Sequence, residues 1–84
     1  MNYIKETLKK ETSSFEELIE CFEKIKTNGE VVVIKFDGER NENAYTVFIS
    51  FPNNKREMIR IDDNDLKNAL IKVLNIYLES PKEN

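Results

Sequence analysis

The chain contains no histidine and only one cysteine, and these absences exclude several kinds of site. Without histidine it lacks the commonest general base near neutral pH and the commonest metal ligand in proteins. The single cysteine, Cys21, cannot form a disulfide within the chain, so a reducing compartment is expected. Cys21 lies beside the apolar stripe of a predicted helix, and the sequence offers no partner base for it. We therefore predict that Cys21 is a partly buried structural cysteine.

Long apolar runs, glycine and proline are also scarce. No stretch approaches the roughly 20 apolar residues of a transmembrane helix, and the N-terminal residues lack the apolar core of a signal peptide. With two glycines and two prolines among 84 residues, the sequence favours regular secondary structure. We therefore expect a single small domain, residues 1–84, that is cytoplasmic and does not enter a membrane.

Charge is plentiful but acidic on balance. The composition is 39% hydrophobic and 35% charged, with a formal net charge of −3, which is typical of a soluble globular protein. General binding to nucleic acid requires a basic surface, so nucleic acid is not the expected partner.

Two stretches are predicted to form helices. Ser14 and Glu17 have the spacing of a capping box at the start of the first, and Asn28 and Gly29 suit its C-terminal end. Its apolar stripe is predicted to contain Phe15, Leu18, Ile19, Phe22 and Ile25. The second helix is predicted to begin at residue 62 or 63 and to run to about residue 79, because aspartates suit the first turn. Its broad apolar sector predicts contacts with both a sheet and the first helix.

Between these helices, residues 30–36, 44–51 and 56–61 are rich in β-branched and aromatic residues and predict three strands. Side chains alternate between the two faces of a strand. The face that we call the apolar face carries Val32, Ile34, Phe36, Tyr45, Val47, Ile49, Phe51, Ile59 and Ile61. The opposite face, which we call the mixed face, carries Val31, Val33, Lys35, Thr46, Phe48, Ser50, Met58 and Arg60.

The apolar face stays continuous in one register only. The predicted pairs are Val32–Ile49, Ile34–Val47 and Phe36–Tyr45 in the first hairpin, and Ile49–Ile59 and Val47–Ile61 in the second. A shift of one residue would bring charged side chains into the core. Ile34, Val47 and Ile49 are therefore expected to be almost fully buried beneath the helices.

The predicted fold class is α+β: a three-stranded antiparallel β-meander with two helices packed on one face, in the order α-β-β-β-α. Residues 1–12 are predicted to be either a short helix or an arm that docks through Tyr3, Ile4 and Leu8. Residues 80–84 are predicted to be a flexible tail.

Two groups of carboxylates resemble cation sites at first sight. Asp37, Glu39 and Glu42 surround a glycine, but they lack the ligand spacing of an EF-hand loop and indicate a solvated hairpin loop. The aspartates between residues 62 and 65 are explained by helix capping. No catalytic, cofactor-binding or metal-binding residues are predicted.

The mixed face is the predicted partner-binding surface, because helices on the apolar face would leave it uncovered. The residues assigned to it are Val31, Val33, Lys35, Phe48, Met58 and Arg60. Exposed apolar patches often mark interaction sites. Two other interpretations are that the N-terminal arm covers this face, or that it is ordinary half-exposed sheet surface.

The expected function is a non-catalytic binding or regulatory module with a protein partner that the sequence does not identify. In size and charge the chain is similar to immunity proteins and antitoxins, and this similarity implies an inhibitor that covers the active site of its partner. A homodimer through the mixed face is a further expectation. The alternative is a nucleic-acid-binding module, in which Phe48, flanked by Lys35 and Arg60, stacks on a base of single-stranded RNA.

Overall fold

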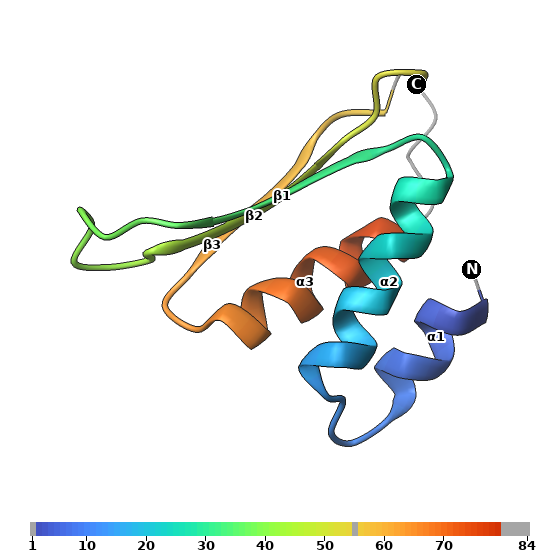
Figure 1. Ribbon diagram of the computed structural model, residues 1–84, viewed down its shortest axis with the longest axis horizontal. Helices are drawn as coiled ribbons and strands as arrows, with labels where there is room; N and C mark the ends of the chain where they lie inside the picture. The colour runs from blue at the N-terminus through green and yellow to red at the C-terminus, as the bar shows by residue number, and fades with distance from the viewer. Residues whose placement is uncertain (1, 55, 80–84) are drawn as a thin grey trace.

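The computed structural model describes residues 2–54 and 56–79. Its elements are α1 (Asn2–Lys9), α2 (Phe15–Thr27), β1 (Val31–Phe36), β2 (Tyr45–Ser50), β3 (Ile59–Asp63) and α3 (Leu66–Leu78). The strands form one antiparallel sheet, and the helices form a layer on one side of it (Figure 1). The α+β class and the meander are confirmed, with three helices rather than two. The tail predicted for residues 80–84 lies outside the described residues.

The N-terminal segment is a helix and not a loose arm. The side chain of Ile4 is fully buried in the core, and Leu8 packs against the core from the next turn. α1 contacts α2 and α3, so it lies in the helix layer and the mixed face is not its docking site. The hydroxyl of Ser13, which is buried, donates to the carbonyl of Thr7 at 2.7 Å and fixes the turn into α2.

The register of the sheet is the predicted one. Val32 faces Ile49 and Ile34 faces Val47 in the first hairpin, while Val47 faces Ile61 in the second. α3 packs against β2 and β3, and the side chains of Val47 and Ile49 are fully buried. Ile34 is only partly buried, against the prediction, because it lies on β1, outside the strands that α3 covers.

The second helix, α2, is capped as predicted but turns a different side to the core. Ser14 and Glu17 form the capping box, and Gly29 follows the helix with a φ of +91°. The buried residues are Leu18, Cys21, Phe22 and Ile25. Cys21 is thus fully rather than partly buried, and Ile19, predicted for the stripe, is 43% exposed. The reason is the tilt of α2, which diverges from the sheet toward its N-terminal end (Figure 1).

The third strand and the last helix begin later than predicted. Asp62 and Asp63 belong to β3, whose pairing with β2 extends to the Tyr45–Asp63 pair. The N-cap of α3 is Asp65, whose carboxylate accepts from the backbone N–H of Asn68 at 2.8 Å. The start of β3 at Ile59 leaves the segment before it outside the sheet, and its Arg56 binds the C-terminal end of α3 instead.

Candidate interaction surfaces

The mixed face is open in the described part of the chain and faces away from the helices. Val31 and Val33 on β1 are 46% and 37% exposed, and Met58, directly before β3, is 52% exposed. Phe48 lies between them on the central strand, opposite Val33 on one side and Arg60 on the other, and is half-buried. Val31, Val33 and Phe48 therefore lie on one face of the sheet, whereas Met58 lies outside the strand in which it was predicted.

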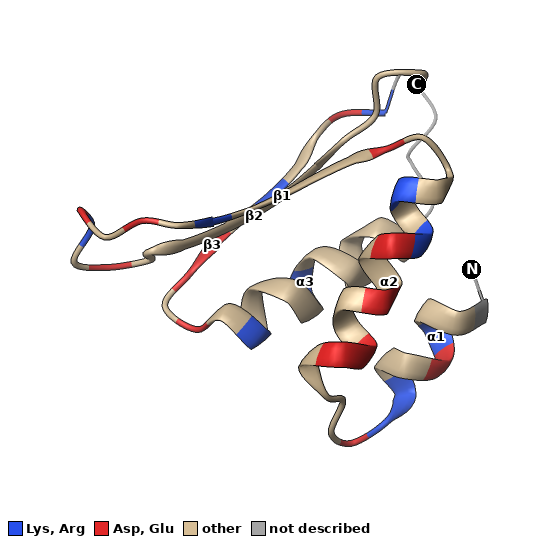
Figure 2. Cartoon of the chain, viewed as in Figure 1, with Lys and Arg blue, Asp and Glu red and all other residues tan. Residues whose placement is uncertain are grey.

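The charged residues of the mixed face are paired with acidic neighbours. Lys35 lies 3.4 Å from Asp37, and Arg60 lies 3.3 Å from Asp62. Arg40, from the β1–β2 loop, bridges the two carboxylates at 3.6 Å from Asp37 and 3.3 Å from Asp62. Figure 2 shows acidic and basic positions close together at the end of the sheet that carries the β1–β2 loop. The mixed face thus has an apolar part and an ion-paired part.

Asp62 is held in this network by several donors. The hydroxyl of Thr46, which is itself buried, donates to its carboxylate across the strand pair. This hydrogen bond, followed by that from Arg60, lowers the pKa of Asp62 below its ordinary value. The backbone N–H of Glu39, and then Lys35, likewise lower the pKa of Asp37. These partners of Asp62 and Asp37 were not predicted from the sequence. The register could have indicated Thr46 as a partner of Asp62, because it places Thr46 opposite both Lys35 and Asp62.

The two groups of carboxylates serve the local structure. Asp37 accepts from Glu39 at 3.0 Å and closes the turn after β1. Asp63 accepts from the ammonium of Lys72 at 2.6 Å and from the backbone N–H of Asp65 at 3.0 Å, which joins β3 to α3. Within residues 2–54 and 56–79, no group of three or more acidic or cysteine side chains is arranged to hold a metal ion.

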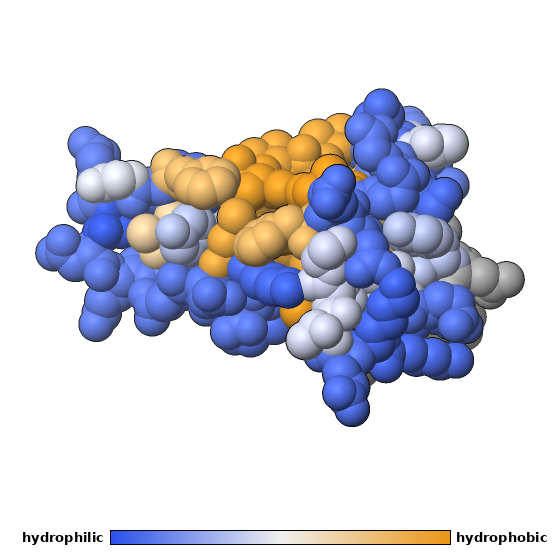
Figure 3. Space-filling view, turned by 60° about the horizontal axis from the view of Figure 1, so that its bottom comes forward, coloured by the Kyte–Doolittle hydropathy of each residue, from blue (hydrophilic) through white to orange (hydrophobic). Residues whose placement is uncertain are grey.

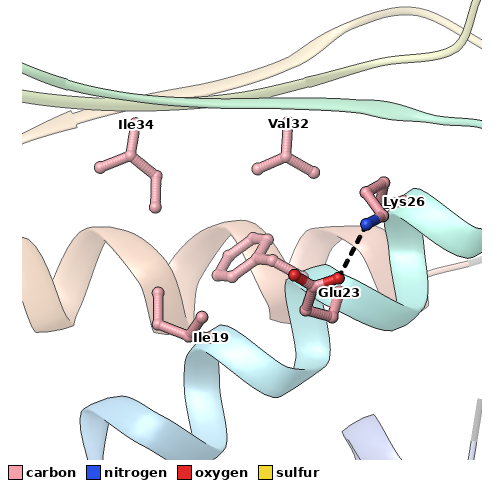
Figure 4. Close-up of a pocket in the computed structure, with 6 residues that line it drawn as sticks. Ile19, Glu23, Lys26, Val32 and Ile34 are labelled. Atoms are coloured by element: carbon pink, nitrogen blue, oxygen red, sulfur yellow. Dashed lines mark ion pairs between the residues drawn. The ribbon is translucent and has the colours of Figure 1, made fainter.

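A second surface lies on the helix side, and prediction from sequence missed it entirely. A groove of about 280 Å³ separates α2 from β1, and its lining residues are Ile19, Phe22, Glu23, Lys26, Val32 and Ile34. Val32 and Ile34 point from β1 toward α2, and an ion pair of 3.0 Å between Lys26 and Glu23 lies at one end (Figure 4). The groove follows from the tilt of α2 and from the position of α3 beneath β2 and β3.

The groove belongs to a larger apolar region. Figure 3 shows a hydrophobic patch in the middle of the helix side, with hydrophilic residues on both sides of it. Phe36, at the end of β1, is 67% exposed, although its ring packs edge-on against Tyr45 at a centroid distance of 5.4 Å. Phe15 is 48% exposed at the start of α2, with the ammonium of Lys67 5.6 Å from its ring centroid.

Cys21 is remote from both surfaces. Its side chain is fully buried beside the other core residues of α2. Burial raises the pKa of the thiol, because the thiolate is poorly solvated there. This environment is that of a structural cysteine.

None of the helices among the described residues is long and apolar enough to span a membrane. Comparison of the chain with protein-family models, with curated proteins and with solved structures finds no match in any of the three. The function therefore has to be inferred from the surfaces themselves.

Proposed function

We propose that the protein is a non-catalytic binding module whose mixed face binds another protein. The observation that carries the proposal is the pair of exposed apolar side chains on that face, Val31 and Val33, beside the half-buried ring of Phe48, with the exposed Met58 directly before β3. Covering such side chains is favourable at roughly 25 cal/mol per Å² of apolar area. A rigid sheet also presents them with little loss of conformational freedom on binding.

A protein partner suits this surface better than RNA does. Sheets that bind single-stranded RNA stack its bases on two or three aromatic rings, and nearby basic groups meet the phosphates. Here Phe48 is the aromatic residue of the mixed face, and Lys35 and Arg60 are already paired with carboxylates. A phosphate would have to displace Asp37 or Asp62, whereas an apolar protein surface would leave both ion pairs intact.

One form of this function is an inhibitor that covers a site on its partner, as immunity proteins and antitoxins do. A free, buried cysteine supports a reducing compartment such as the cytoplasm. For self-association we propose another surface, the outer edge of β1, which leaves the mixed face to a different protein.

The test is retention of a partner from native cell extract by immobilised wild-type protein and by two variants, Phe48→Asp and Met58→Asp. Tyr3→Asp is the matched control, since it adds the same charge at a side chain that is 37% exposed on α1. We expect the control to retain the same single stoichiometric protein as the wild type and the two mixed-face variants to lose it. Circular dichroism checks that all variants are folded. Retention by folded Phe48→Asp and Met58→Asp, or recovery of nucleic acid instead of protein, would contradict the proposal.

A further inference from the structure

β1 forms one edge of the sheet, and alternate residues along it turn their backbone N–H and C=O groups away from β2. The described strands have the order β1–β2–β3. The backbone N–H of Asp37 donates to the carbonyl of Ala44 at 2.8 Å, which continues the β1–β2 ladder. Bonded and non-bonded pairs alternate in an antiparallel ladder. Counting back from Asp37, the residues of β1 that turn their N–H and C=O groups outward are Val32, Ile34 and Phe36.

The other edge, β3, has charged residues at the corresponding positions. The residues of β2 that do not bond to β1 turn toward β3, so the outward-turned residues of β3 are Arg60 and Asp62. Charged side chains on an edge strand oppose pairing with another strand. In β1 the outward-turned residues are all apolar, and its one charged residue, Lys35, is paired with Asp37.

The groove lies beneath this unprotected edge. A strand added beside β1 would direct every second side chain to the helix side, next to Val32 and Ile34 and above Ile19 of α2. Ile19 is 43% exposed there, and a groove of about 280 Å³ is below the usual ~300–1,000 Å³ of sites for drug-sized ligands. Its size and its position below an open edge suit side chains of an added strand.

We propose that a second copy of this chain occupies the edge, with the two β1 strands antiparallel about a two-fold axis and Ile34 opposite Ile34 of the second copy. β1 is self-complementary in this register, because Val32 then faces Phe36 of the second copy and all the outward-turned residues form bonded pairs. The exposed ring of Phe36 from each copy then lies beside Val32 of the other, over its groove.

Charge selects this register over a neighbouring one. With Ile34 at the centre, Lys35 faces Val33 of the second copy on the mixed face. A shift that places Lys35 opposite Lys35 would set like charges against each other, which is destabilising. The two-fold axis runs perpendicular to the sheet, so the joined sheet has six strands, with both mixed faces on one side and all the helices on the other. The inference thus goes beyond the proposed function and enlarges the surface available to a partner.

Amide hydrogen exchange by NMR, combined with sedimentation, tests the proposal directly. Over about 10 µM to about 1 mM, mass action should convert monomer into dimer. The amides of Ile34 and Phe36 should become protected as the dimer forms. Those of Val33 and Lys35, which bond to β2 in either state, are internal controls and should not change. A chain that remains monomeric at about 1 mM, or a dimer in which the Ile34 amide still exchanges rapidly, overturns the proposal.

Three variants separate this edge from the mixed face. Phe36→Pro removes an outward N–H that β2 does not use, and proline is tolerated on the solvent side of an edge strand. We expect it to stay folded and monomeric. Phe36→Ala keeps the N–H and should weaken the dimer at least ~10-fold in Kd, as loss of a buried aromatic side chain does. Phe48→Asp should dimerise normally. The assignment of the dimer interface to the β1 edge is overturned if Phe36→Pro dimerises like the wild type, or if Phe48→Asp alone becomes monomeric. Either result leaves the test of partner binding by the mixed face unaffected.

Discussion

Arg56 closes the C-terminal end of α3 through Tyr77. Its guanidinium donates to the carbonyl of Tyr77 at 3.0 Å, and it lies 5.5 Å from the centroid of the Tyr77 ring. It also donates to the carbonyls of Ile76 at 2.8 Å and of Glu79 at 3.2 Å. The last carbonyls of a helix have no partner within the helix and carry partial negative charge. The carbonyl of Ile76 also accepts from the backbone N–H of Glu79 at 3.0 Å. One side chain from the β2–β3 connection thus bonds to three carbonyls at this helix end and stacks on the aromatic pair of Tyr77 and Phe51.

We predict that Arg56→Ala lowers the free energy of unfolding by about 1–3 kcal/mol, because hydrogen bonds from a charged donor to partly buried carbonyls are lost. The stability of Arg56→Lys should lie between those of the wild type and Arg56→Ala, because an ammonium cannot reproduce the planar, forked set of donors of a guanidinium. Arg60→Ala serves as the control: its exposed ion pair is worth about 0–1 kcal/mol. Urea denaturation measures all three. Equal losses for Arg56→Ala and Arg60→Ala would mean that the helix end does not depend on Arg56.

α3 covers β2 more closely than α2 covers β1, so a valine-to-alanine substitution should lower the free energy of unfolding by different amounts on the two strands. Val47→Ala should lower the free energy of unfolding by about 1–3 kcal/mol, because it removes buried methyl groups and leaves a cavity beneath α3. Val32→Ala makes the same change beside the groove, where Val32 is only partly buried and water can fill the space, and should cost less than ~1 kcal/mol. Equal costs in chemical denaturation would show that α2 covers β1 as tightly as α3 covers β2.

The network around Asp62 predicts stability that is lost in acid. Its pKa is lowered in the folded chain, so folding favours the ionised carboxylate. The stabilisation is complete well above the unfolded value of about 3.9 and disappears as the pH falls through the lower folded value. Asp62→Asn should therefore be less stable than the wild type at pH 7 and equally stable in strong acid. Glu42→Gln, in the exposed β1–β2 loop, controls for the loss of one negative charge. A difference between Asp62→Asn and the wild type that does not change with pH would contradict this account.

The register of the sheet could be predicted from sequence because alternation allows few solutions. Pairing Ile34 with Val47 places Val32 and Ile49 on the same face, and Val33 and Phe48 on the opposite one. Alternation along the strands therefore determines the two faces. The cap of α2 was predictable for a similar reason: Ser14 and Glu17 interact within a single turn.

The tilt of α2 could not be predicted, because no local signal determines how a helix lies across a sheet. The same stripe of apolar residues allows Cys21 or Ile19 to face the core, and packing of α1 and α3 selects Cys21. Arg56 was predicted to start the third strand for a related reason. Its partners on α3 are about twenty residues away in the sequence, and a pattern read along the chain does not contain them.

The place of α3 in the chain has a consequence for synthesis on the ribosome. α3 packs against β2 and β3 but follows them in the sequence. While α3 is still inside the exit tunnel, Val47 and Ile49 have no helix above them, and the hairpins present an apolar face as well as an apolar edge. Nascent chains in this condition aggregate readily and are held by chaperones. The side chains of Val47 and Ile49 are therefore shielded from water only after α3 has emerged, which is after all three strands have been synthesised.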